Sequence, residues 1–119
     1  MDCSGRCCIF VYKFSSLQTM KFTHFHVHSQ YSILDGAASI PGLIEKAKAD
    51  GQAALALTDH GNMFGIKLFY DTCRQKGIKP ILGMEAYVAP RSHLEKSGMR
   101  ENAHLILLSK NEQGYKNLM

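Results

Sequence analysis

Histidine and carboxylate side chains fall at or near the ends of the strands that this sequence predicts. His26 and His28 form an H-x-H pair that closes the first predicted strand. Residues two apart on a strand point to the same side, so both imidazoles can converge on one or two metal ions. The candidate functional side chains are His26, His28, Asp35, Asp59, His60, Glu85 and His104.

These candidates share one kind of chemistry, because all of them offer nitrogen or oxygen donors. Such a set favours Zn²⁺, Mn²⁺ or Fe²⁺ over a metal held by thiolates. Several ions bridged by carboxylates bind phosphate oxygens and lower the pKa of a bound water, which makes that water a nucleophile. The pattern is therefore typical of metal-dependent phosphoester hydrolysis.

Each signal also has an ordinary structural interpretation when it is taken singly. The H-x-H pair is compatible with two surface or core histidines, and Glu85, in an otherwise apolar strand, with a buried salt bridge. We expect Asp59 to orient His60 or to cap a helix rather than to bind metal. His24 is expected to be structural and His93 to be solvated. Only the conjunction of the candidates at strand ends favours a metal site.

The hydrophobic pattern predicts the elements that must position these residues. Apolar residues spaced as on one helix face follow Ser39, a good N-cap, and end before Gly51. A second helix, with a buried stripe of Ile66, Phe69, Tyr70 and Cys73, stops at Gly77. The strands are expected over residues 21–28, 53–58, 78–88 and 104–109, with a polar loop over 91–103 and a last helix capped by Asn111.

This order of elements predicts an α/β fold with a largely parallel sheet and flanking helices. In such folds functional groups gather at the carboxyl ends of the strands. His104 is the exception to this rule, because it opens its predicted strand instead of closing it. A helix signal begins at Asn111 and the sequence ends at Met119, so we expect the front portion of a longer domain.

Composition excludes several classes of protein. The chain has 119 residues, of which 45% are apolar and 20% charged, with a net charge of +4. These values exclude collagen-like, coiled-coil and strongly disordered chains, and no apolar run reaches the roughly 18 residues of a transmembrane helix. The small positive charge is explained by a solvated surface as well as by a nucleic-acid partner.

The first residues differ in character from the rest. Cys3, Cys7 and Cys8 fall within the first eight residues, a clustering that favours a reducing compartment over a secreted disulfide framework. They lack a fourth ligand at zinc-site spacing, and the apolar run over 7–12 is too short for a signal peptide. We interpret residues 1–19 as a disordered upstream extension and residues 20–119 as the domain portion.

Four strings in the sequence resemble one known family. They are FHVHSQYSILDG at 25–36, ALTDHGNMFG at 56–65, GIKPILGME at 77–85 and HLILLSKN at 104–111. Together they resemble the polymerase-and-histidinol-phosphatase (PHP) domain of bacterial DNA polymerase III alpha subunits. General PHP phosphatases share the H-x-H, D-H and E elements, but not the S-x-L-D-G or T-D-H-G-N-M-F-G strings. The resemblance runs from about Met20 to Met119.

The resemblance implies a fold and a ligand set. The fold would be the N-terminal part of a distorted (β/α)7 barrel with parallel strands, carrying up to three divalent ions, Zn²⁺ or Mn²⁺, at its strand ends. The remaining ligands of the family, a Cys or His and an Asp-x-His pair, would lie downstream of Met119. The ligands implied in this sequence are His26, His28, Asp35, His60, Glu85 and His104.

The resemblance also implies a biological role. The parent protein would be a cytoplasmic DNA-directed DNA polymerase that acts in replication with DNA and the other holoenzyme subunits, away from any membrane. We expect the isolated chain to lack polymerase and efficient phosphoesterase activity. The alternatives are a stand-alone PHP phosphoesterase of the histidinol-phosphatase type and a truncated chain that cannot fold.

Overall fold

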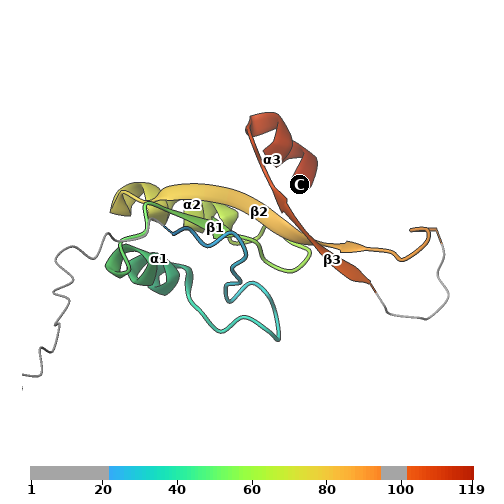
Figure 1. The fold of residues 1–119 in the computed structure, drawn as a ribbon, viewed down its shortest axis with the longest axis horizontal. Helices are drawn as coiled ribbons and strands as arrows, with labels where there is room; N and C mark the ends of the chain where they lie inside the picture. Colours follow the sequence, from blue (N-terminus) through green and yellow to red (C-terminus); the bar gives the residue numbers. More distant parts are fainter. Residues whose placement is uncertain (1–21, 95–101) are drawn as a thin grey trace, which may run out of the picture.

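A computed structural model describes residues 22–94 and 102–119, which form a three-stranded sheet with three helices (Figure 1). The expected extension over 1–19, residues 20 and 21, and the part of the predicted loop over 95–101 lie outside the described residues. The elements are α1 (Ile40–Ala49), β1 (Ala54–Leu57), α2 (Ile66–Lys76), β2 (Lys79–Val88), β3 (Ala103–Leu108) and α3 (Glu112–Leu118).

The sheet is mixed, in the order β1-β2-β3. β1 pairs in parallel with β2, from Ala54 opposite Lys79 to Leu57 opposite Leu82. β3 runs antiparallel to β2. The expectation of a largely parallel sheet therefore holds for β1 and β2 and is wrong for β3. The physical reason lies in the connections, because a parallel pair needs a crossover, usually a helix, and the described part of the β2–β3 connection contains none.

The segment before α1 is not the regular strand predicted over 21–28, although it lies beside β1. The Ala56 N–H donates to His24 O (3.0 Å) and the Thr58 N–H donates to Val27 O (2.9 Å). Between these two hydrogen bonds the segment moves on by three residues, from His24 to Val27, while the chain beside it moves on by two, from Ala56 to Thr58. This is the geometry of a β-bulge, which bends the chain and interrupts the ladder. The prediction was correct in placing this segment at the sheet and wrong in its regularity.

The predicted helix signals are confirmed at their ends. Ser39 caps α1 by accepting a hydrogen bond from the Gly42 N–H (3.3 Å), and Asn111 caps α3 by accepting from the Gly114 N–H (2.9 Å). Gly77 ends α2 with φ 74°, a left-handed conformation that costs glycine little.

The core lies between α1, α2 and the sheet. Its buried apolar side chains are Ile40, Ile44, Ala47, Leu55, Leu57, Ile66, Phe69, Cys73 and Ile78. Tyr70 was predicted to belong to the buried stripe of α2, but it is 44% exposed. The stripe is centred on Ile66, Phe69 and Cys73, so Tyr70 falls on its flank.

The burial of Cys73 gives a test of the core. Burial raises the pKa of the Cys73 thiol to about 11. In a chain carrying Cys3→Ser, Cys7→Ser and Cys8→Ser, we expect Cys73 to resist iodoacetamide at about pH 8.5, the ordinary thiol pKa. After unfolding in guanidinium it should react fully. Rapid alkylation of the native chain, followed by mass spectrometry, would contradict the packing of α2.

None of the helices within residues 22–94 and 102–119 has the length and apolar character that crossing a bilayer requires.

Candidate metal centre

The direction of β3 explains how His104 joins the other candidates. β1 and β2 are parallel, so His60, just after β1, lies beside Glu85 near the end of β2, where the two residues form an isolated bridge. His104 lies opposite Tyr87 in the antiparallel β2–β3 pair. The beginning of β3 therefore meets the carboxyl ends of β1 and β2. His104 opens its strand and still faces the same site.

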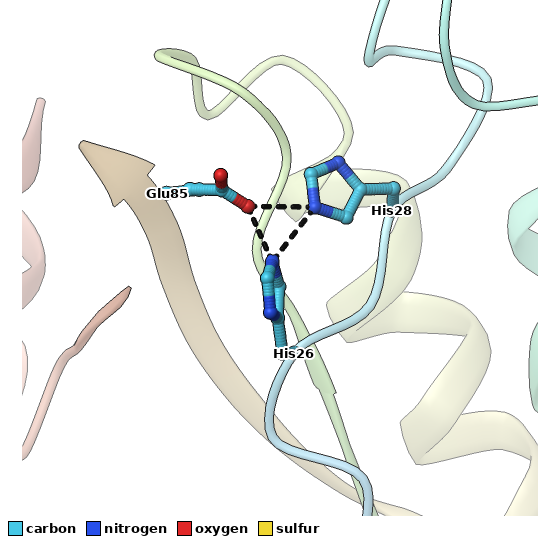
Figure 2. A group of neighbouring side chains, drawn as sticks. All are labelled: His26, His28 and Glu85. Carbon is cyan, nitrogen blue, oxygen red and sulfur yellow. Dashed lines mark hydrogen bonds and ion pairs between the residues drawn. The ribbon is translucent and has the colours of Figure 1, made fainter. Parts of the chain in front are cut away.

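Glu85 is the centre of the site, because its side chain is 1% exposed and meets four imidazoles. One oxygen, Oε2, contacts His26 Nε2 and lies 2.8 Å from His28 Nε2. The two Nε2 atoms are 3.0 Å apart, so both rings point at one carboxylate oxygen (Figure 2). This is the convergence that the H-x-H spacing predicts.

The second oxygen of Glu85 faces the other two histidines. Oε1 contacts His104 Nδ1 and lies 3.4 Å from His60 Nδ1. Among the described residues, His60 Nδ1 is buried and has no hydrogen-bond partner. A buried nitrogen left without a hydrogen bond is costly in a folded chain. A metal ion at this place would take its lone pair.

Asp35 completes the set from the loop after the first segment. Its Oδ2 lies 2.8 Å from His60 Nε2 and 4.0 Å from His28 Nδ1, and its side chain is 64% exposed. The carboxylate thus borders the open side of the site. A carboxylate in this position can accept a hydrogen bond, or it can bind a cation together with the His28 and His60 rings.

The six residues form three overlapping groups. In each group one ligand atom per residue lies within 4.8 Å of the others. Each of three residues, His28, His60 and Glu85, belongs to two of the groups, so the site is one continuous cluster. The groups are His26, His28 and Glu85; His28, Asp35 and His60; and His60, Glu85 and His104.

The surroundings of Glu85 favour its charged form. Burial raises the pKa of Glu85, but hydrogen bonds with His26 and His28, together with the charges of His60 and His26, outweigh it, so the pKa lies below the ordinary value. A buried carboxylate that stays ionised beside imidazole nitrogens is a suitable ligand for a divalent cation.

Two other histidines lie apart from the cluster. The backbone N–H of His24 lies 3.4 Å from Gln52 Oε1, and its ring packs edge-on against Phe22. His93 is exposed in the loop after β2. Neither belongs to the three groups of candidate ligands.

A network of hydroxyl groups beneath the histidines was missed by sequence reasoning. Ser29, Ser32 and Thr58 are fully buried, and Ser29 and Ser32 both bond to the buried carboxylate of Asp59. Asp59 does not cap α2, whose N-cap is Gly65. The one available signal was the pair of serines in 29–32, between the H-x-H motif and Asp35.

Comparisons with known proteins show the family of the chain. The profile of the PHP domain family matches residues 24–119. The chain is 56% identical over 103 residues to the DNA polymerase III subunit alpha of Treponema pallidum, covering 84% of this chain and 9% of that protein. The corresponding subunit of Borreliella burgdorferi is 53% identical over 102 residues, covering 83% of this chain and 9% of that protein.

Solved structures share the fold. An amidohydrolase from Chromobacterium violaceum, solved with bound sulfate and no metal, matches with a TM-score of 0.59 and 28% identity, covering 81% of this chain and 31% of that one. A candidate metal-dependent phosphoesterase from Bifidobacterium adolescentis matches with a TM-score of 0.54 and 19% identity, covering 81% of this chain and 30% of that one.

The chain belongs to the PHP domain family, since the family profile covers most of its length. Its curated relatives named above are alpha subunits of DNA polymerase III, and the chain spans about a tenth of their length.

Proposed function

We propose that this chain is the PHP-domain portion of a bacterial replicative DNA polymerase and that its histidine–carboxylate cluster binds divalent metal ions. The observation that carries the metal site is the buried Glu85 carboxylate facing four imidazoles, one with an orphaned nitrogen. The polymerase assignment rests on sequence identities of 56% and 53% to alpha subunits of DNA polymerase III. Zn²⁺ and Mn²⁺ are the ions we propose, because the donors are imidazoles and carboxylates.

The ligands divide among the three groups. Glu85 would offer both oxygens to bound ions, Oε2 beside His26 and His28 and Oε1 beside His60 and His104. Asp35 would supply a further oxygen beside His60. Bound ions would supply Lewis-acid binding of phosphate oxygens and an activated water. In the complete domain, with the further ligands expected past Met119 and up to three ions, the cluster would be a site of phosphoesterase type in a distorted (β/α)7 barrel.

The residues around the cluster have roles of their own. Glu85 holds a negative charge at a buried place, which concentrates cations there. Asp35 borders the solvent, where it can accept a proton from a water or from an incoming group. Tyr87 is stacked against His60, at 9° between the rings, and restricts how that ring turns.

The proposed partners follow from the polymerase assignment. The chain would act in the cytoplasm, within a protein that binds DNA and the other subunits of the polymerase III holoenzyme. The DNA sequence of the gene past the codon for Met119 tests this. A frame that continues to the length of the polymerase relatives supports the assignment. A frame that ends soon after a Cys or His and an Asp-x-His set favours a small phosphoesterase instead.

Metal titration tests the site itself. We expect the purified chain to bind Zn²⁺ or Mn²⁺ in competition with a chromogenic chelator, and its melting temperature to rise with metal and fall with EDTA. The rise follows from mass action, because an ion that binds only the folded state stabilises it. A chain that competes for no divalent ion and whose melting temperature ignores EDTA would contradict the proposal.

A further inference from the structure

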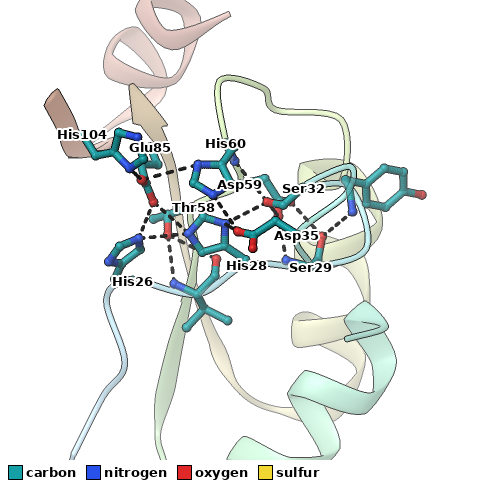
Figure 3. Close-up of polar contacts among 12 residues, drawn as sticks. His26, His28, Ser29, Ser32, Asp35, Thr58, Asp59, His60, Glu85 and His104 are labelled. Atoms are coloured by element: carbon teal, nitrogen blue, oxygen red, sulfur yellow. Dashed lines mark hydrogen bonds and ion pairs between the residues drawn. The ribbon is translucent and has the colours of Figure 1, made fainter. Parts of the chain in front are cut away.

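Ser32 sits beneath the metal cluster with its hydroxyl group fully buried. Three groups surround its Oγ: Asp59 Oδ1 at 2.8 Å, the His60 backbone N–H at 3.1 Å and His28 Nδ1 at 2.9 Å (Figure 3). A hydroxyl has one hydrogen to donate and two lone pairs to accept with. Three partners therefore use its whole capacity, and each partner must take one role.

Asp59 takes the hydrogen of Ser32. Its carboxylate is buried and also accepts from the Ser29 N–H (2.6 Å) and the Ser29 hydroxyl (2.8 Å). The two carboxylate oxygens of Asp59 thus accept from three donors, and the Ser32 hydroxyl is one of them. The single O–H of Ser32 is thus committed to Asp59.

The two lone pairs of Ser32 must then accept from its other neighbours. The backbone N–H of His60 can only donate, so it occupies one lone pair. His28 Nδ1 meets the second lone pair and must carry a hydrogen to make this bond. Nε2 is then the nitrogen of His28 that is left for a metal ion, and it faces Glu85 Oε2 and His26 Nε2.

We propose that Ser32, held by Asp59, is a positioning residue that keeps a hydrogen on His28 Nδ1 and fixes the orientation of the ring, so that Nε2 faces the metal cluster. This rests on the proposed metal-binding function. Metal-binding histidines commonly donate their second N–H to an oxygen, and loss of such a partner costs about 10–100-fold in metal affinity. Here the oxygen is a serine hydroxyl whose own direction is set by a buried carboxylate.

The Ser32 hydroxyl can be removed without loss of the backbone hydrogen bonds that hold the turn. The Ser32 N–H donates to Ser29 O, and Ser32 O accepts from the Asp35 and Gly36 N–H groups. An alanine at position 32 keeps these three bonds and removes only the hydroxyl. Ser29→Ala is the matched control, because it also removes one buried hydroxyl from Asp59, and Ser29 Oγ contacts no histidine.

The first experiment needs no variant. Long-range ¹H–¹⁵N NMR of the metal-free chain reports whether His28 Nδ1 carries a hydrogen. We expect a hydrogen on Nδ1, because the Ser32 hydroxyl can only accept there. An Nδ1 without a hydrogen would overturn the proposal. This measurement is independent of metal binding, so a chain that binds no metal but carries a hydrogen on Nδ1 would defeat the proposed function and leave the inference standing.

The second experiment measures metal affinity by chelator competition. Ser32→Ala is expected to weaken Zn²⁺ binding about 10–100-fold and to lower the occupancy of the hydrogen on His28 Nδ1, while Ser29→Ala changes affinity much less. An affinity of Ser32→Ala within twofold of the parent chain, or an equal loss in Ser29→Ala, would overturn the positioning role. Circular dichroism of both variants shows whether they fold, and the Nδ1 hydrogen of the parent chain decides the matter if Ser32→Ala does not.

Discussion

Glu85→Gln should remove most of the bound metal from this chain and most of the stability that metal provides. Glu85 belongs to two of the three ligand groups and meets four imidazoles, so one neutral amide weakens both groups together. At a free metal concentration about 100 times Kd, bound metal adds about 2.7 kcal/mol to the free energy of unfolding. The variant should lose most of that increment, because metal-binding energy is also folding energy.

The measurement is metal content by plasma emission, followed by thermal unfolding with and without metal. His26→Ala should act in the same direction, because His26 meets Glu85 and His28 at the same point. Glu45→Gln is the matched control, since Glu45 is a surface carboxylate that pairs with Lys76 (2.5 Å) and belongs to none of the three ligand groups. It should leave metal content unchanged. Parent-level metal in both Glu85→Gln and His26→Ala would refute the ligand assignment.

Gly36→Ala should disrupt the loop that carries Ser32 and Asp35. A Cβ at position 36 would overlap the backbone carbonyl of Ser29, so the backbone itself must move. That carbonyl accepts the Ser32 N–H, and the Gly36 N–H donates to Ser32 O, so the displacement acts directly on the turn. We expect a loss of stability of about 1–3 kcal/mol, as for overpacking, together with weaker metal binding.

Gly51→Ala provides the contrast for this prediction. Gly51 has φ 72° and nothing within 4 Å of the position of an added Cβ. Alanine there should cost about 1–2 kcal/mol from the left-handed conformation and leave metal affinity unchanged. Urea unfolding and chelator competition on both variants separate the two effects. Parent-level affinity in Gly36→Ala would show that the loop does not control the site.

The sequence predicted the helices and their ends well. Ser39, Asn111 and Gly77 act through contacts within one helical turn, and such local interactions leave a pattern that can be read without the fold. β1 and β2 were also predicted correctly, because short and nearly continuous apolar runs are typical of strands that are covered on both faces. Tyr70 was misplaced because periodicity gives the centre of a buried stripe more reliably than its edge.

The resemblance to the PHP family implied the six candidate ligands, which stay a prediction. Local features alone, the H-x-H spacing and a lone glutamate in an apolar strand, pointed to His26, His28 and Glu85. The H-x-H geometry survives even though its segment is bulged and not a regular strand. His26 and His28 converge on Glu85, which is 57 residues from His28 in the sequence and contacts both rings through one oxygen. The spacing of the two histidines predicted the convergence, but only the structure shows that Glu85 lies at its centre.

What the sequence alone determined is therefore the set of elements, their caps and the donor types of a metal site, because these depend on neighbours three or four residues apart. Only the tertiary structure decided the direction of β3, which brings His104 to the others, and the pairing of Ser32 with Asp59, 27 residues further along the chain. Strand direction and hydroxyl partners depend on contacts between distant segments. A one-dimensional pattern carries no record of which distant segments meet.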